Sequence, residues 1–227
     1  MLFAMRVSVP DEPGMLGAVA TALSRGGANI VTLDVVGHED GIAVDDLCLE
    51  APEGLTDALR RAAEDVPGAV VEAVRPMAAF RDVLSPMELA ASLVDSPPDE
   101  ILKALVDGLP GALWGTWAAA LRRKDGRLHE LAASPTATSL SNVETPWLPI
   151  DRPRRFAHAL WMPPAWRMGR LGYEVAAAPL FDPLSAVVLV RRHGPRFRAG
   201  ELRQLGLLAR MTVSLLDDIE IHLVAHG

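Results

Sequence analysis

The feature that most restricts the fold of this chain is the order of hydrophobic patterns in residues 1–80. Residues 2–9 form an apolar run closed by Pro10, which predicts a strand. Residues 14–25 then carry apolar side chains at helical spacing, and two glycines follow as a stop signal. A strand that leads directly into a helix is therefore expected at the start of the chain.

Two further apolar, β-branched runs follow at 30–37 and 41–49, and the sequence HEDG between them is a strong hairpin signal. Residues 54–65 repeat apolar side chains on one helical face, and 69–74 are typical of a last strand. The order βαββαβ predicts a ferredoxin-like α+β unit, with two helices on one face of a four-stranded antiparallel sheet. Because so small a sheet keeps an open edge, we expect it to pair with a second copy or a partner domain.

The first strand-to-helix turn, PDEPGML, has the composition of an anion-binding helix start. Gly14 lets a ligand approach the backbone closely, and Pro13 stands where a missing N–H costs little. The first turn of the helix offers unpaired N–H groups and the positive end of the helix dipole, which suit a carboxylate. Asp11 or Glu12 could instead cap the helix and occupy the same donors. The residues alone leave both alternatives open.

Residues 2–76 resemble an ACT domain, a small module that senses amino acids. The motifs that carry the resemblance are DEPGML, GGANI and GIAVDDLCL. It implies that Asn29 lines an effector site at a subunit interface, although Asn29 could equally be a turn residue after two glycines. We expect Gly14 and Asn29 to lie at the same end of the first two strands. The ligand-binding residues that the resemblance implies are Asp11, Glu12, Pro13, Gly14, Met15, Leu16, Asn29 and Ile30.

A second domain is expected after residue 78, with a helical linker at 79–98 and a domain at 99–227. Pro97-Pro98 interrupts the helical pattern there. The pattern of the second domain predicts a sheet framed by helices. Its expected elements are a helix at 99–107, strands at 112–121, 128–134, 173–181 and 185–192, and a helix at 198–227.

Residues 98–226 resemble a GAF domain, a sensory fold related to PAS, through AAAPLFDPLSAVVLV and the long closing helix. The resemblance implies that residues 135–170 cross the sheet and can hold a small ligand. Tryptophan and arginine alternate in that segment and could form a pocket for an anionic or planar ligand. The alternative is a proline-rich surface excursion with stacked side chains, which we favour. The residues concerned are Trp147, Arg152, Arg154, Arg155, Trp161, Trp166, Arg167 and Arg170.

Charge and composition exclude several classes of function. The formal net charge is −7, and residues 1–80 hold five Arg against thirteen Asp and Glu, so direct nucleic-acid binding is not expected. The lone Cys48 is expected to be buried, and it suits a reducing cytosol. We find neither a signal-peptide pattern nor an apolar run long enough to span a membrane, so a cytoplasmic protein without membrane contact is expected.

The sequence offers little support for catalysis or a bound metal. It contains no nucleophile elbow, phosphate-binding loop or dinucleotide fingerprint. His222 and His226 share a helical face but lack further ligands, so no metal and no cofactor are expected. Asp45 and Asp46 are adjacent in a strand and should point to opposite faces.

We therefore expect a non-catalytic regulatory protein, a homodimer whose ACT domain binds a small effector, most simply an amino acid. The second domain would bind another ligand or transmit the signal. The alternative is a dimerising module that binds partner proteins and no metabolite.

Overall fold

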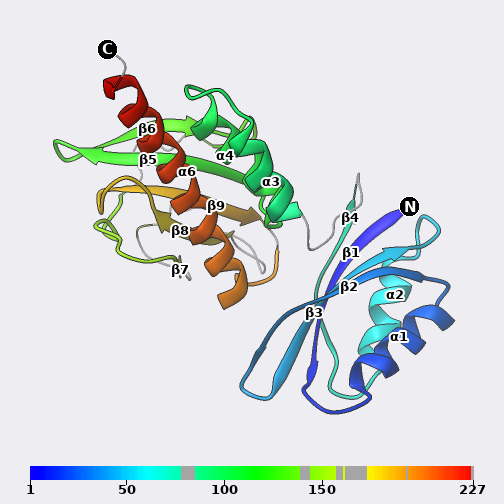
Figure 1. Cartoon of the computed structure of the whole chain (residues 1–227). Coiled ribbons are helices and arrows are strands. Elements are labelled where there is room, and N and C mark those ends of the chain that lie inside the picture. The colour runs from blue at the N-terminus through cyan, green and yellow to red at the C-terminus, as the bar shows by residue number, and fades with distance from the viewer. Residues whose placement is uncertain (78–84, 139–143, 157–160, 162–172, 193, 226–227) are drawn as a thin grey trace. The chain divides into compact units, whose positions relative to one another are not determined.

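The computed structural model describes residues 1–77, 85–138, 144–156, 161, 173–192 and 194–225, with the side chains of 218–225 left aside (Figure 1). The chain divides into two compact units, residues 1–83 and 84–227. The linker expected at 79–98 falls partly outside the described residues. Its described part contains helix α3 (Ser85–Val94), which packs within the second unit.

The first unit has the βαββαβ order expected from the sequence, and its antiparallel strands lie in the order β2-β3-β1-β4 (Figure 1). The β2–β3 hairpin turns at Asp40 and Gly41, both at positive φ, as the HEDG sequence predicts. The elements are β1 (Leu2–Pro10), α1 (Met15–Arg25), β2 (Asn29–Glu39), β3 (Ile42–Glu50), α2 (Thr56–Glu64) and β4 (Val70–Met77).

The core of this unit lies between the sheet and its two helices. Alternate residues of β1 enter it, among them Met5 and Val7, and they meet Leu23 of α1 and Leu59 of α2. Cys48 is buried, as expected. The apolar residues that recur at strand spacing and those that recur at helical spacing thus pack into the same interior.

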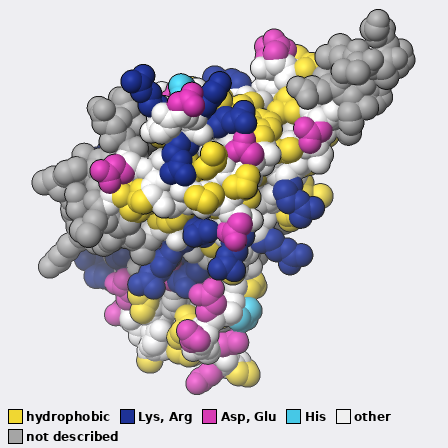
Figure 2. All heavy atoms as spheres, turned by 90° about the vertical axis from the view of Figure 1, so that its left-hand side faces the viewer, with side chains coloured by type: hydrophobic (Ala, Val, Ile, Leu, Met, Phe, Trp, Pro, Cys, Tyr) yellow, Lys and Arg dark blue, Asp and Glu magenta, His cyan; other side chains and the backbone are white. Residues whose placement is uncertain are grey.

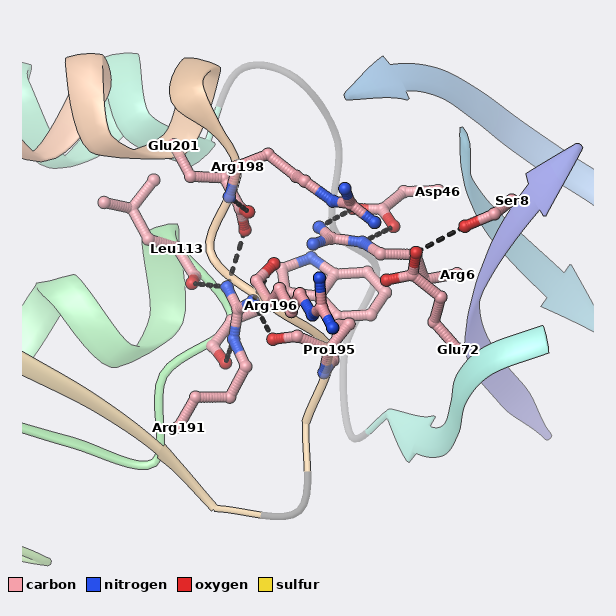
Figure 3. A network of polar contacts seen from close by, with 11 residues as sticks. Arg6, Ser8, Asp46, Glu72, Leu113, Arg191, Pro195, Arg196, Arg198 and Glu201 are labelled. Carbon is pink, nitrogen blue, oxygen red and sulfur yellow. Dashed lines mark hydrogen bonds and ion pairs between the residues drawn. The ribbon is translucent and has the colours of Figure 1, made fainter. Parts of the chain in front are cut away.

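On the other face of the sheet, polar side chains pair across neighbouring strands (Figure 3). Arg6 binds Asp46 through two hydrogen bonds, of 2.6 and 2.7 Å, and the two residues are register partners on β1 and β3. The hydroxyl of Ser8 donates to Glu72 of β4. The Asp46 side chain therefore lies on this polar face of the sheet, and the Asp45 side chain lies on the opposite face, as the strand period predicts.

Strand β2 is the edge of the sheet and carries uncovered apolar side chains. Val31, Leu33 and Val35 are 40%, 36% and 57% exposed. Within the described part of the chain, no further strand pairs with the free side of β2. An apolar edge of this length is usually protected by pairing.

The second unit is a five-stranded antiparallel sheet in the order β6-β5-β9-β8-β7, with α3, α4 and α6 packed against one face. The α+β sheet framed by helices that the sequence predicts is confirmed. Besides α3, its elements are α4 (Ile101–Ala112), β5 (Trp117–Lys124), β6 (Arg127–Ala133), β7 (Arg154–Phe156), β8 (Tyr173–Pro179), β9 (Ser185–Arg192) and α6 (Ala199–Ala225).

The strand expected at 112–121 starts later than predicted. Helix α4 continues through Pro110 to Ala112, and the chain turns at Trp114, whose φ is +56°. The strand then begins at Trp117. A short apolar run cannot be divided between helix and strand by periodicity alone, which explains the difference.

The face of the sheet away from the helices is covered by the segment that includes residues 144–156. Trp147 is 8% exposed and packs with Phe156 and Trp161, with ring centroids 5.2 to 6.0 Å apart. The favoured expectation of a surface excursion is therefore wrong for Trp147 and its neighbours. Trp147 is a buried core residue, and Phe156 and Trp161 are partly buried against the same cluster, because the sheet is apolar on both faces.

A buried arginine joins three elements of this unit (Figure 3). Arg191, at the end of β9, forms an ion pair of 2.6 Å with Glu201 in the first turn of α6, and both side chains are under 10% exposed. The guanidinium also donates to the carbonyl oxygens of Leu113, Trp114 and Pro195, at 2.8, 2.9 and 2.8 Å. The pair therefore fixes the start of α6 against the end of α4.

Candidate functional site

The N-terminal end of α1 is free of side-chain caps. Gly14 is the N-cap residue at φ +95°, and no side chain makes a capping hydrogen bond. The capping alternative for Asp11 and Glu12 is thus not realised in the structure. Met15 N–H reaches the Glu12 carbonyl oxygen at 3.3 Å, so one donor is used within the turn.

Two further donors at this helix end stay open. The N–H groups of Leu16 and Gly17 have no hydrogen-bond acceptor among the described residues. A substituent at Gly14 would meet nothing within 4 Å, so the space before the helix is clear. Free N–H groups and the positive end of the helix dipole together favour a carboxylate at this position.

Acidic groups surround the same turn. The N–H of Asp11 donates to the Gly41 carbonyl oxygen at 2.8 Å, which ties the turn to the β2–β3 hairpin. The Asp11 carboxylate lies 3.1 Å from Nδ1 of His38 on β2, and both side chains are about half exposed. Carboxylate charge is therefore held beside the open helix end.

Asp45 adds a buried carboxylate to this region. It is 2% exposed, on the face of β3 that also carries the core residues Ala43 and Leu47. Burial raises the pKa of Asp45, and the nearby charges of His38 and Asp11 act on it in opposite directions. Asp45 has no hydrogen-bond partner among the described residues. A buried carboxylate that accepts no hydrogen bond is costly, and such groups are common at functional sites.

Asn29 lies at the opposite end of the sheet from Gly14, so the expectation of a shared end is wrong. Asn29 pairs with Glu50, as Leu2 does, whereas Pro10 pairs with Ile42. The ends of β3 are separated by roughly 26 Å at the usual rise per residue. The physical reason is that α1 carries the chain back to the level where β1 began.

The remaining residues of the predicted site divide between surface and core. Pro13 is exposed in the turn, and Met15 and Ile30 are partly buried and pack against the core. The sequence did not indicate His38 or Asp45 as members of the site. A signal for Asp45 was present, because it is an acidic residue at a core-facing position of an apolar strand.

The arginines expected between the tryptophans take separate roles. Arg154 contacts Asp151 at 2.9 Å and Arg155 lies 3.5 Å from Glu174, whose pKa is raised by burial. Arg152 is exposed. Trp166, Arg167 and Arg170 lie outside the described residues, as does His226, and the structure does not describe the side chain of His222.

The described residues contain no group of three or more His, Cys, Asp or Glu side chains arranged to hold a metal ion. They also contain no helix with the length and apolar composition that crossing a membrane requires.

Comparison with known proteins identifies the first unit. Residues 4–75 match the ACT domain family, so the N-terminal unit is an ACT domain. No curated protein sequence matches the chain significantly. The ACT domain of GTP pyrophosphokinase from Chlorobium tepidum is a similar solved structure, at 22% identity and a TM-score of 0.28, covering 34% of this chain and 97% of that one.

Two solved structures are similar to larger parts of the chain. The first is the GAF domain of a Pseudomonas syringae pv. tomato protein described as a sensor histidine kinase, at 18% identity and a TM-score of 0.45, covering 64% of this chain and 92% of that one. The second is the phytochrome photosensory core module of Stigmatella aurantiaca, at 11% identity and a TM-score of 0.45, covering 80% and 41%.

Proposed function

We propose that the protein is a non-catalytic regulatory protein whose ACT domain binds a free amino acid. The observation that carries the proposal is the uncapped start of α1 beside an acidic group. An amino acid presents a carboxylate and an ammonium group within one small molecule. The open N–H groups of Leu16 and Gly17 suit the carboxylate.

The ammonium group of the effector is assigned to the acidic side of the turn. Asp11 is exposed there, and Asp45 is a buried carboxylate without a hydrogen bond in the described part of the chain. An ammonium ion donates three hydrogen bonds and would give Asp45 the partner that it lacks. Asp45 thus distinguishes an amino acid from a simple carboxylic acid.

In a dimer, Asn29 of one copy of the chain would join the effector site of the other copy. Strand β2 runs from Asn29 to Glu39, so antiparallel pairing of β2 with β2 of another copy sets Asn29 beside the partner strand's far end. That end carries His38, next to the turn. Pairing would also cover the apolar edge that Val35 exposes. An effector held between two copies would favour one arrangement of the subunits.

Thermal melting with each of the twenty amino acids tests this function. We expect a selective upward shift, because a ligand that binds only the native state adds about 2.7 kcal/mol at a hundredfold excess over its Kd. The amine without the carboxylate and the acid without the ammonium group should each give a smaller shift. If no amino acid shifts the melt near millimolar concentration, the proposal fails and the rival function, a dimerising protein-interaction module, gains support.

Asp45→Asn locates the ammonium group. This variant should bind the amino acid and its deaminated analogue about equally, whereas the native chain should prefer the amino acid by about tenfold. The fold should persist. Because burial raises the pKa of Asp45, the carboxylate destabilises the folded state above that pKa, and the amide removes this cost at neutral pH. Undiminished preference in Asp45→Asn would place the ammonium elsewhere.

A further inference from the structure

A groove of about 650 Å³ runs along α6 in the second unit, and none of its lining residues belongs to the effector site described above. One wall is a single face of α6, and the other is the segment Asp151–Pro153, with Pro179 at the end of β8. The volume lies within the range of sites that hold small organic ligands. The helix residues that line it are Ala199, Leu202, Arg203, Gly206, Leu207 and Arg210.

The walls approach each other because α6 carries a glycine at the point of contact. A Cβ on Gly206 would lie 2.4 Å from Cγ of Pro153, a distance that real Cβ contacts do not show. Glycine inside a helix costs about 1 kcal/mol relative to alanine. Gly206 therefore has a packing role, because its lack of a side chain lets Asp151–Pro153 lie close against the helix at the groove.

The groove combines positive charge with an apolar floor. Arg152, Arg203 and Arg210 line it, and the latter two have no ion pair with any described residue. Asp151 is the acidic group of the lining, and hydrogen bonds from its own backbone N–H and from Arg154, at 2.9 Å, lower its pKa. Leu207 lies between the two helix arginines and is 51% exposed. In the view of Figure 2, hydrophobic side chains likewise lie between Lys and Arg side chains on the surface.

The spacing of the charges indicates the shape of a ligand. Arg203 and Arg210 are two helical turns apart, about 10 Å along the axis. A compact ion would meet one guanidinium group, whereas an elongated ligand with an anionic group at each end meets both and covers the leucine between them. Guanidinium groups bind carboxylate and phosphate through paired hydrogen bonds.

We propose that this groove binds an elongated organic dianion, in which two carboxylate or phosphate groups are joined by an aliphatic body. All of its lining residues belong to the second unit, and it shares no residue with the amino-acid site proposed on α1. It would give the protein a second ligand of different chemistry.

Calorimetric titration of the full chain with succinate, suberate, sebacate and octanediol bisphosphate tests the proposal. We expect sebacate to bind at least about tenfold more tightly than succinate, because the longer body buries more apolar surface. The ratio of sebacate to bisphosphate affinity then identifies the preferred end group. Equal affinity of succinate and sebacate, or no binding by any of the four, would overturn the proposal.

Variants at exposed positions place the site without endangering the fold. Arg203→Gln and Arg210→Gln should each weaken sebacate binding about tenfold, because each removes a charge-assisted hydrogen bond. Arg127→Gln, at an exposed arginine of β6 outside the groove, is the matched control and should bind as the native chain does. Equal affinity in all three variants would reject the groove as the binding site. Gly14→Val should leave sebacate binding unchanged, which separates this site from the effector site.

Discussion

Arg191→Met should lower the free energy of unfolding of the second unit by about 3 to 5 kcal/mol, the usual cost of breaking a buried ion pair. The substitution leaves the Glu201 carboxylate without its guanidinium partner at 2.6 Å. It also removes the donor to the carbonyl oxygens of Leu113 and Pro195. Thermal unfolding followed by near-UV circular dichroism should show a midpoint lower by on the order of 10 °C.

The control for this variant is Arg127→Met, which removes an exposed arginine of β6 in the same unit. Surface substitutions of this kind usually change stability by less than about 0.5 kcal/mol. The double variant Arg191→Met with Glu201→Leu should recover part of the loss, because no unpaired charge remains buried. Equal midpoints for Arg191→Met and Arg127→Met would show that the pair does not hold α6 in place.

Gly14→Val should abolish amino-acid binding at concentrations that shift the melt of the native chain. Gly14 has φ +95°, a conformation that a β-branched residue adopts only with strain. Relief of that strain would move the turn and the open N–H groups of the first helical turn. We expect a loss of affinity of a hundredfold or more together with a loss of stability of about 1 to 3 kcal/mol.

Gly54→Val separates the two effects. Gly54 is in the same unit, has φ +87°, and its added side chain would also meet nothing within 4 Å. It therefore carries similar backbone strain at a place remote in sequence from the turn. Gly54→Val should lose stability but keep the ligand-induced shift of the melt. Equal loss of that shift in both variants would mean that Gly14 acts through stability alone.

The fold of the first unit could be predicted from the sequence because its turn and helix-stop motifs indicate the same elements as the βαββαβ order does. The Asp40-Gly41 turn, the helix stop at Gly26 and the apolar run closed by Pro10 each predict the element that the structure shows. The second unit was less accessible where one apolar run spans a helix end and a strand start, at residues 112–121. Strand β7 has only three residues and leaves no periodic pattern.

The candidate site was accessible only in part. The DEPGML turn identifies the helix start, because its glycine and proline act locally. Asp45 and His38 join the site through strand pairing, which no local motif reports. The prediction placed Asn29 at the wrong end of the sheet. Helix α1 carries the chain back along the sheet before β2 begins, and this decides which end Asn29 reaches. Such long-range placements depend on the complete topology.

The central claim is that an amino-acid carboxylate binds the open start of α1. The most direct measurement is an amide NMR titration of the isotope-labelled chain with the amino acid that shifts the melt most. We predict that the largest downfield shifts occur at the amides of Leu16 and Gly17, whose N–H groups gain a charged acceptor. Shifts confined to residues 84–227, with these two amides unchanged, would contradict the account.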